Sequence, residues 1–131
     1  MSRVEWDIIN SKVKELAKYG LIELAIGNCA AATVLPVKKD ENGNYTDRRM
    51  CGDSRALNLK TEHDQYPMPI LKDMFDTMDE CKYFPIMDMR QRFNQIEMCP
   101  VDKEKTAFSA TQRRWQWKVI TLCLKNAGAC F

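Results

Sequence analysis

Between Arg114 and Val119 the side chains alternate strictly between polar and apolar, and no other stretch constrains the fold as strongly. Trp115, Trp117 and Val119 occupy every second position, and the residues between them are polar. This period of two predicts a β-strand that buries two indoles on one face. Because Arg113–Lys118 also mixes cations with aromatic rings, contact with a nucleic-acid template is the alternative interpretation.

Helical patterns are found elsewhere in the chain. Ser2 and Glu5 have capping-box spacing, apolar side chains from Ile9 to Ala17 recur on one face, and Gly20 can end the helix. A second helix is predicted over 70–79 after Pro69, and residues 124–131 are consistent with the start of a third.

Shorter extended stretches separate these helices. Residues 32–38 predict an edge strand because they contain Pro36, and the Asn-Gly turn at 42–43 predicts a return over 47–52. The resulting hairpin, 33–52, has basic residues where its strands approach the turn, namely Lys38, Lys39, Arg48 and Arg49. A further strand is predicted over 82–87, ending at Asp88. Helices and strands are interspersed without repeats, so the expected class is α+β or mixed α/β.

Composition excludes several function classes. The net charge of +2 indicates no general affinity for nucleic acid, so such binding must depend on local patches. The six cysteines have no CxxC spacing and the only histidine, His63, lies in a polar turn, which argues against a zinc site. No signal peptide and no apolar run near 20 residues is found. We therefore expect an intracellular chain with free thiols that is not secreted and has no membrane partner.

Asp88 is the first candidate for chemistry. A carboxylate at the carboxyl end of a strand can hold a hard divalent cation beside a phosphate, although such aspartates are more often turn residues. Phe93, five positions later, could form the floor of a nucleotide pocket or belong to the core.

Six segments, taken in order, resemble the amino-terminal half of the reverse transcriptase of gypsy-type LTR retrotransposons. Any one match is weak, but six in order across most of the chain are strong support. The segments are 15–23, 34–40, 49–58, 66–70, 82–96, and 105–108 together with 126–131.

The resemblance implies a right-hand polymerase fold, represented by its fingers and a partial, truncated palm. The fingers would comprise about 1–63 and 96–119, and the palm about 64–95 and 120–131. The implied activity is RNA-directed DNA polymerisation by a Pol polyprotein whose remainder is missing here. The implied partners are an RNA or DNA template-primer and a deoxynucleoside triphosphate.

The resemblance also implies roles for single residues. Asp88 would be the first metal-binding carboxylate, in a family whose complete enzymes hold two magnesium ions. Lys38 and Arg49 would contact the triphosphate, and Phe93 would be the steric gate against a ribose 2′-hydroxyl. Arg55 matches a position that we assign to template contact, and Arg114 is a template candidate because of its aromatic neighbours.

Several departures predict that the 131-residue chain is inactive alone. It contains no Tyr-x-Asp-Asp motif, and one carboxylate cannot hold two magnesium ions. Arg92 stands where the family has glycine, and its bulky charge could fill the site or strain the turn. Pro85 interrupts the strand before Asp88. Two alternatives stay open: a domesticated nucleic-acid-binding module without catalysis, and a window cut from a longer, active reading frame.

Overall fold

A five-stranded sheet organises the computed structural model, which describes residues 3–36, 49–67, 70–79 and 81–130. The strand order is β1-β5-β4-β2-β3, with β2 and β4 parallel and the other neighbours antiparallel. The fold is therefore α+β, as the sequence predicted. The bounds are β1 Ile22–Leu24, β2 Ala31–Val34, β3 Cys51–Gly52, β4 Phe108–Ala110 and β5 Arg113–Trp117.

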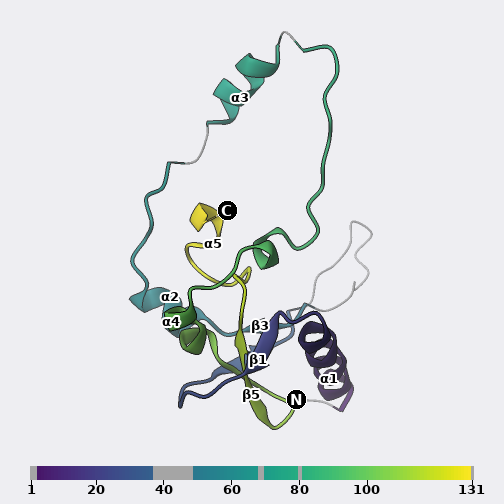
Figure 1. The fold of residues 1–131 in the computed structure, drawn as a ribbon, viewed down its shortest axis with the longest axis vertical. Helices are drawn as coiled ribbons and strands as arrows, with labels where there is room; N and C mark the ends of the chain where they lie inside the picture. The colour runs from purple at the N-terminus through teal and green to yellow at the C-terminus, as the bar shows by residue number, and fades with distance from the viewer. Residues whose placement is uncertain (1–2, 37–48, 68–69, 80, 131) are drawn as a thin grey trace.

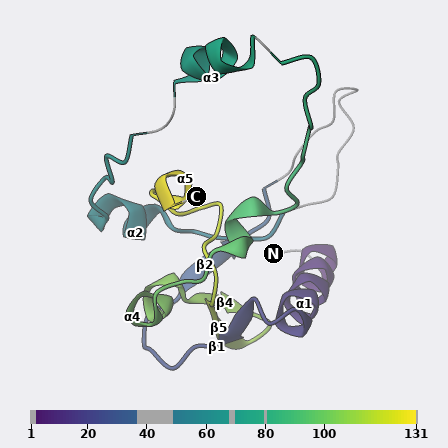
Figure 2. The same cartoon turned by 45° about the horizontal axis from the view of Figure 1, so that its top comes forward.

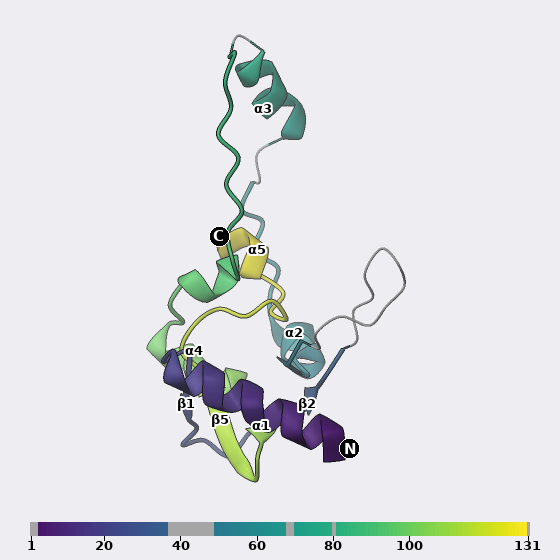
Figure 3. The same cartoon turned by 90° about the vertical axis from the view of Figure 1, so that its right-hand side faces the viewer.

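The amino-terminal helix α1 (Arg3–Lys18) lies across this sheet (Figure 3) and confirms the predicted amphipathic pattern. It buries Ile9 and Val13 against the core. Gly20 has a φ of +69°, and the amides of Gly20 and Leu21 donate to the carbonyls of Ala17 and Leu16. This pair of bonds is a Schellman motif, which ends the helix at a residue that needs left-handed backbone. Ser2, of the predicted capping box, lies outside the described residues.

The core lies between α1 and the strands. Phe108 is the most buried large side chain, at 1% exposure, and its ring centroid lies 5.6 Å from that of Trp117. Trp117 and Val119 are buried and Trp115 is half-buried, so the predicted apolar face of β5 is confirmed. Gln116, on the opposite face, is buried as well, because its Nε2 donates to Glu23 Oε1 of β1 at 2.9 Å.

The predicted hairpin is confirmed in its pairing and corrected in its position. β2 and β3 pair antiparallel, with Thr33 opposite Gly52, and the tip at 37–48 lies outside the described residues. The edge-strand prediction for 32–38 was wrong, because β2 lies between β4 and β3. The strand ends at Val34, so the missing amide of Pro36 falls outside the ladder and does not disrupt it.

The remaining elements are short. They are α2 (Arg55–Lys60), α3 (Leu71–Met78), the 3-10 helix η1 (Arg92–Gln95), α4 (Pro100–Lys103), the 3-10 helix η2 (Glu104–Thr106) and α5 (Ala127–Cys130). Helices predicted over 70–79 and near the carboxyl end are thus present. Figure 2 shows α2 and α5, whose surroundings are joined by hydrogen bonds from Asn58 of α2 to the Cys123 carbonyl and from Asn126 to the Glu62 carbonyl.

A long excursion carries α3 and residues 81–90 away from the sheet (Figure 1). The strand predicted over 82–87 was wrong: the segment is extended but pairs with no strand among the described residues. A strand is stabilised by its ladder partner, and its side-chain pattern alone does not provide one. Met74, Met87 and Met89 on this excursion are exposed, with Met87 at 85%. In the described part of the chain, no helix has the length and apolar character needed to cross a bilayer.

Candidate nucleotide and template site

Asp88 lies in the extended segment between α3 and η1. Its side chain is exposed, and the described residues offer it no ion pair or hydrogen bond. An exposed carboxylate without a partner keeps its acceptor oxygens available to a cation or to water. The structure therefore leaves Asp88 accessible, but it does not bring Asp88 into contact with any of the arginines predicted to bind nucleotide or template.

Phe93 lies in η1, next in the chain to the predicted site of strain. The guanidinium carbon of Arg92 lies 4.6 Å from the centroid of the Phe93 ring, a cation–π contact that covers one face of a half-buried ring. The left-handed residue of this turn is Gln91, with φ 49° and ψ 49°. Arg92 itself begins the 3-10 helix, so no glycine is needed at its position.

The residues that follow η1 pair with the residues that follow β5. Glu97 and Val119 form an antiparallel bridge, and the amides of Met98 and Ile120 donate to the carbonyls of Lys118 and Ile96 at 2.8 and 2.9 Å. These bonds connect the turn that carries Phe93 to the strand that carries the buried indoles. The position of Phe93 is thus set by the sheet, whereas that of Asp88 is not.

The two predicted triphosphate contacts fall at the hairpin. Lys38 lies outside the described residues. Arg49 is exposed just before β3, which begins at Cys51 and places the arginine beside the sheet's β3 edge. An exposed arginine at a strand end can offer its planar fork to a phosphate.

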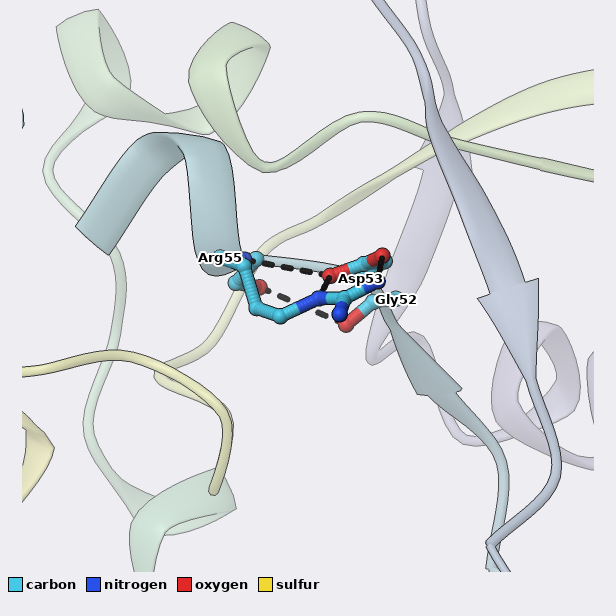
Figure 4. A network of polar contacts seen from close by, with 4 residues as sticks. Gly52, Asp53 and Arg55 are labelled. Carbon is cyan, nitrogen blue, oxygen red and sulfur yellow. Dashed lines mark hydrogen bonds and ion pairs between the residues drawn. The ribbon is translucent and has the colours of Figure 1, made fainter. Parts of the chain in front are cut away.

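Arg55 is held by an aspartate that the sequence interpretation did not single out. Its Nε and Nη2 donate to Asp53 Oδ1 and Oδ2 at 2.8 and 2.6 Å, and its backbone amide donates to Oδ1 at 3.2 Å (Figure 4). These bonds lower the pKa of Asp53 to about 2 and raise that of Arg55. The guanidinium is 86% exposed, so the pair orients Arg55 at the start of α2 without burying its charge. The Asp-x-Arg spacing was the signal that could have identified it.

Arg114 also has a partner within the chain. Its Nη1 donates to the carbonyl of Gly27 at 2.5 Å, in the loop between β1 and β2. The arginine stays exposed on the face of β5 opposite the indoles. One hydrogen-bonding edge of its guanidinium is thus engaged in holding a loop, and the others remain for an external acceptor.

Two asparagines join α2 and the residues after it to the carboxyl-terminal segment. Asn58 donates from Nδ2 to the Cys123 carbonyl at 2.8 Å and accepts the Lys125 amide at Oδ1 at 2.9 Å. Asn126 donates to the Glu62 carbonyl at 2.9 Å and accepts the Asp64 amide at 3.2 Å. We call these four bonds the asparagine clasp. Both asparagines lie in the matched segments, but spacing alone could not show that they face the same interface.

Asp88 is the described side chain that we predicted as a magnesium ligand. The described residues contain no group of three or more histidine, cysteine, aspartate or glutamate side chains that could hold a metal ion. Asp88 is a single exposed carboxylate, and magnesium is normally held by one or two carboxylates together with waters and substrate phosphates. Asp88 is thus chemically suited to be one ligand.

Comparison with known proteins identifies several that are similar in sequence to this chain. No protein-family model matches it. The Pol polyprotein of transposon gypsy from Drosophila melanogaster is 32% identical over 95% of this chain and 12% of its own length. An RNA-directed DNA polymerase homolog from Oenothera berteroana is 32% identical over 63% of this chain and 58% of its own length. The chain thus spans about an eighth of the transposon polyproteins that it matches.

Solved structures share the fold. The foamy viral protease-reverse transcriptase in complex with double-stranded DNA matches 95% of this chain and 21% of its own, with a TM-score of 0.74 at 18% identity. The native prototype foamy virus protease-reverse transcriptase gives a TM-score of 0.66 at 19% identity over 95% of this chain and 16% of its own. The chain is thus similar in sequence to part of retrotransposon Pol polyproteins, and its fold matches that of foamy virus protease-reverse transcriptases.

Proposed function

We propose that this chain is the fingers and first palm portion of an RNA-directed DNA polymerase, and that it acts only together with further polymerase residues. The observation that carries the proposal is the 32% identity to the gypsy polyprotein over 95% of the chain. In support, all five strands lie within 1–63 and 96–119, the ranges expected for the fingers. Residues 64–95 and 120–131 would belong to the palm.

In this proposal Asp88 is one ligand of magnesium, and Arg49 with Lys38 contacts the triphosphate. The bound metal would stabilise charge on the reacting phosphate. Phe93 would lie against the sugar, and Arg55 and Arg114 would contact the template backbone. Asp53 engages Nε and Nη2 of Arg55, so the remaining guanidinium hydrogens of this exposed side chain would donate to the phosphate. Template-primer and a deoxynucleoside triphosphate are the proposed partners, inside the cell.

The exposed apolar excursion supports the requirement for further residues. Tyr83, Ile86 and Met87 are 92%, 95% and 85% exposed. Leu71, Met74 and Phe75 of α3 are exposed as well. Contiguous apolar surface of this kind marks a face that is covered in the working assembly. A covered segment 81–90 would give Asp88 the fixed position that it lacks here.

Primer extension tests the proposal. The DNA downstream of the Phe131 codon is first read for a Tyr-x-Asp-Asp run, and the complete frame is expressed. We expect DNA synthesis on an RNA template with magnesium that Asp88→Asn abolishes and that the matched control Asp79→Asn leaves intact. The isolated 131-residue chain should give no synthesis. Equal activity of the Asp88→Asn enzyme and its parent would refute the role of Asp88.

A nucleic-acid-binding module without catalysis is the second candidate. The observation that favours it is the exposure of Arg49 and Arg114, two arginines without an ion pair among the described residues, which could contact phosphates without any metal at Asp88. It predicts salt-dependent binding of primer-template duplex by the isolated chain, weakened by Arg49→Ala and Arg114→Ala. An unchanged polarisation signal at low salt would exclude it.

A further inference from the structure

A cleft of about 700 Å³ opens between α1 and the sheet. Trp6 and Ile9 of α1 line it, together with Leu24, the last residue of β1. The turn between β4 and β5 and the two arginines that follow it, Arg113 and Arg114, complete the lining. We call this space the α1–β1 cleft. Trp6 and Leu24 are exposed, so the cleft offers apolar surface to a ligand of side-chain size.

The charged residues of this cleft are basic. Arg113 and Arg114 line it, whereas no aspartate or glutamate of the described residues does. Arg113 is exposed and has no ion pair within the described part of the chain. Arg114 donates to the carbonyl of Gly27, which brings its guanidinium to the loop that follows β1. The complementary occupant therefore combines an apolar group with negative charge.

β1 is an edge strand beside this cleft. It is the first strand in the order of the sheet, with β5 on one side and no described strand on the other. The amide of Ala25, the residue after Leu24, donates to the Arg114 carbonyl. Because alternate residues of an antiparallel strand bond its partner, the backbone amides and carbonyls of Leu24 and Ile22 point away from β5. These groups are a template for a further strand.

We propose that β1 and the α1–β1 cleft bind an extended acidic peptide, which adds to the sheet as a strand beside β1. The peptide backbone would pair with the outward amides and carbonyls of Ile22 and Leu24. One apolar side chain would enter the cleft against Trp6, and acidic side chains on the same face would reach the two arginines. Side chains on one face of a strand recur at every second position, so the peptide should alternate with that period.

A peptide fits this surface better than a nucleic acid does. The arginines and the indole alone would suit either, since both ligands carry negative charge and groups that pack on an aromatic ring. The open edge of β1 decides between them, because its alternating donors and acceptors match another peptide backbone in spacing. The site lies at the β1 edge of the sheet, whereas Arg49 lies beside the β3 edge, and it does not depend on the proposed polymerase function.

Selection from a display library of random short peptides tests the proposal. The complete 131-residue chain is immobilised, and the Trp6→Ala chain is selected in parallel after circular dichroism has shown that it is folded. We expect enriched sequences to carry an apolar residue with acidic residues two positions from it. Enrichment of basic sequences, equal enrichment on the two chains, or no enrichment would overturn the proposal.

Polarisation of a fluorescein-labelled enriched peptide separates the contributions. Trp6→Ala and Arg113→Glu should each weaken binding by about tenfold or more, the loss expected for a truncated anchor and a reversed charge. Arg90→Glu is the matched control, because Arg90 is exposed and lies outside the cleft, and it should change binding by less than about twofold. Leu24→Pro removes an outward amide and should weaken binding further than Leu24→Ala, which keeps it.

Methylation of the peptide amides tests the added strand directly. Methyl groups on alternate amides should abolish binding in the register that faces β1 and leave it intact when shifted by one residue, because only one set donates to the edge. Equal effects in the two registers would refute strand addition. Displacement of the peptide by a single-stranded oligonucleotide would assign the cleft to nucleic acid instead, and a dimer of the chain that excludes the peptide would assign it to a second copy.

Discussion

The asparagine clasp makes a measurable contribution to stability, and Asn58 is the residue through which to test it. Asn58→Ala removes two hydrogen bonds between α2 and the carboxyl-terminal segment, to the Cys123 carbonyl at 2.8 Å and from the Lys125 amide at 2.9 Å. The first is partly buried and contributes about 1 kcal/mol, while the second is exposed and contributes roughly 0.5 kcal/mol because water can replace it. The expected loss in the free energy of unfolding is therefore about 1.5 kcal/mol.

Urea unfolding followed by circular dichroism measures this loss. With a slope of about 1.5 kcal/mol per molar urea, the midpoint should fall by about 1 M. Asn28→Ala is the matched control, because Asn28 is exposed in the β1–β2 loop and takes part in none of the side-chain hydrogen bonds of the described residues. The control should shift the midpoint by less than about 0.3 M, within the range of ordinary surface substitutions.

Hydrogen exchange locates the effect. The Lys125 amide is protected by Asn58 Oδ1 and should exchange faster in Asn58→Ala, while the Lys118 amide, which donates to Leu21 within the sheet, should keep its rate. If Asn58→Ala and Asn28→Ala unfold at the same urea concentration, or if Lys125 exchange does not change, the clasp does not hold this interface and the reasoning is wrong.

Two further predictions concern the core and the Asp53–Arg55 pair. Phe108→Ala should lower the free energy of unfolding by about 3–5 kcal/mol, because a ring at 1% exposure leaves a cavity beside Trp117; a loss below about 1 kcal/mol in urea unfolding would contradict this packing. Asp53 has its pKa lowered from 3.8 to about 2 in the folded chain, so its pair with Arg55 stabilises the fold above pH 3.8 and this contribution is lost as the pH falls through 2. Asp53→Asn should remove that part of the acid dependence of the thermal midpoint, and an unchanged acid profile would refute the assignment.

Sequence periodicity predicted the elements whose buried face is determined by the local spacing of apolar side chains. The apolar face from Ile9 to Ala17 produced α1, and Gly20 ended it as expected. The alternation at β5 predicted that Trp115 and Trp117 face the core, because a half-buried strand must place alternate side chains on the core side; Trp117 is buried and Trp115 is half-buried. Both predictions depend only on spacing, and spacing is fully visible in a sequence.

Side-chain spacing did not predict which distant segments pair with one another. Pro36 predicted an edge strand, yet β2 is interior because the strand ends two residues earlier. The run 82–87 has the composition of a strand, but no partner lies beside it in the described chain. Asn58 reaches the Cys123 carbonyl across the fold, and no short-range pattern predicts such a contact.

Arg92, where the resemblance expects glycine, was predicted either to fill the site or to strain the turn. The strain alternative is wrong, because the left-handed residue is Gln91 and Arg92 belongs to the 3-10 helix η1. Arg92 instead limits access to the Phe93 ring, because its guanidinium carbon lies 4.6 Å from the ring centroid. A sugar that packed on that face would have to displace a cation–π contact of about 0.5–1 kcal/mol. Position 92 would therefore influence nucleotide binding through the face of Phe93 that it covers, with the backbone of the turn unaffected.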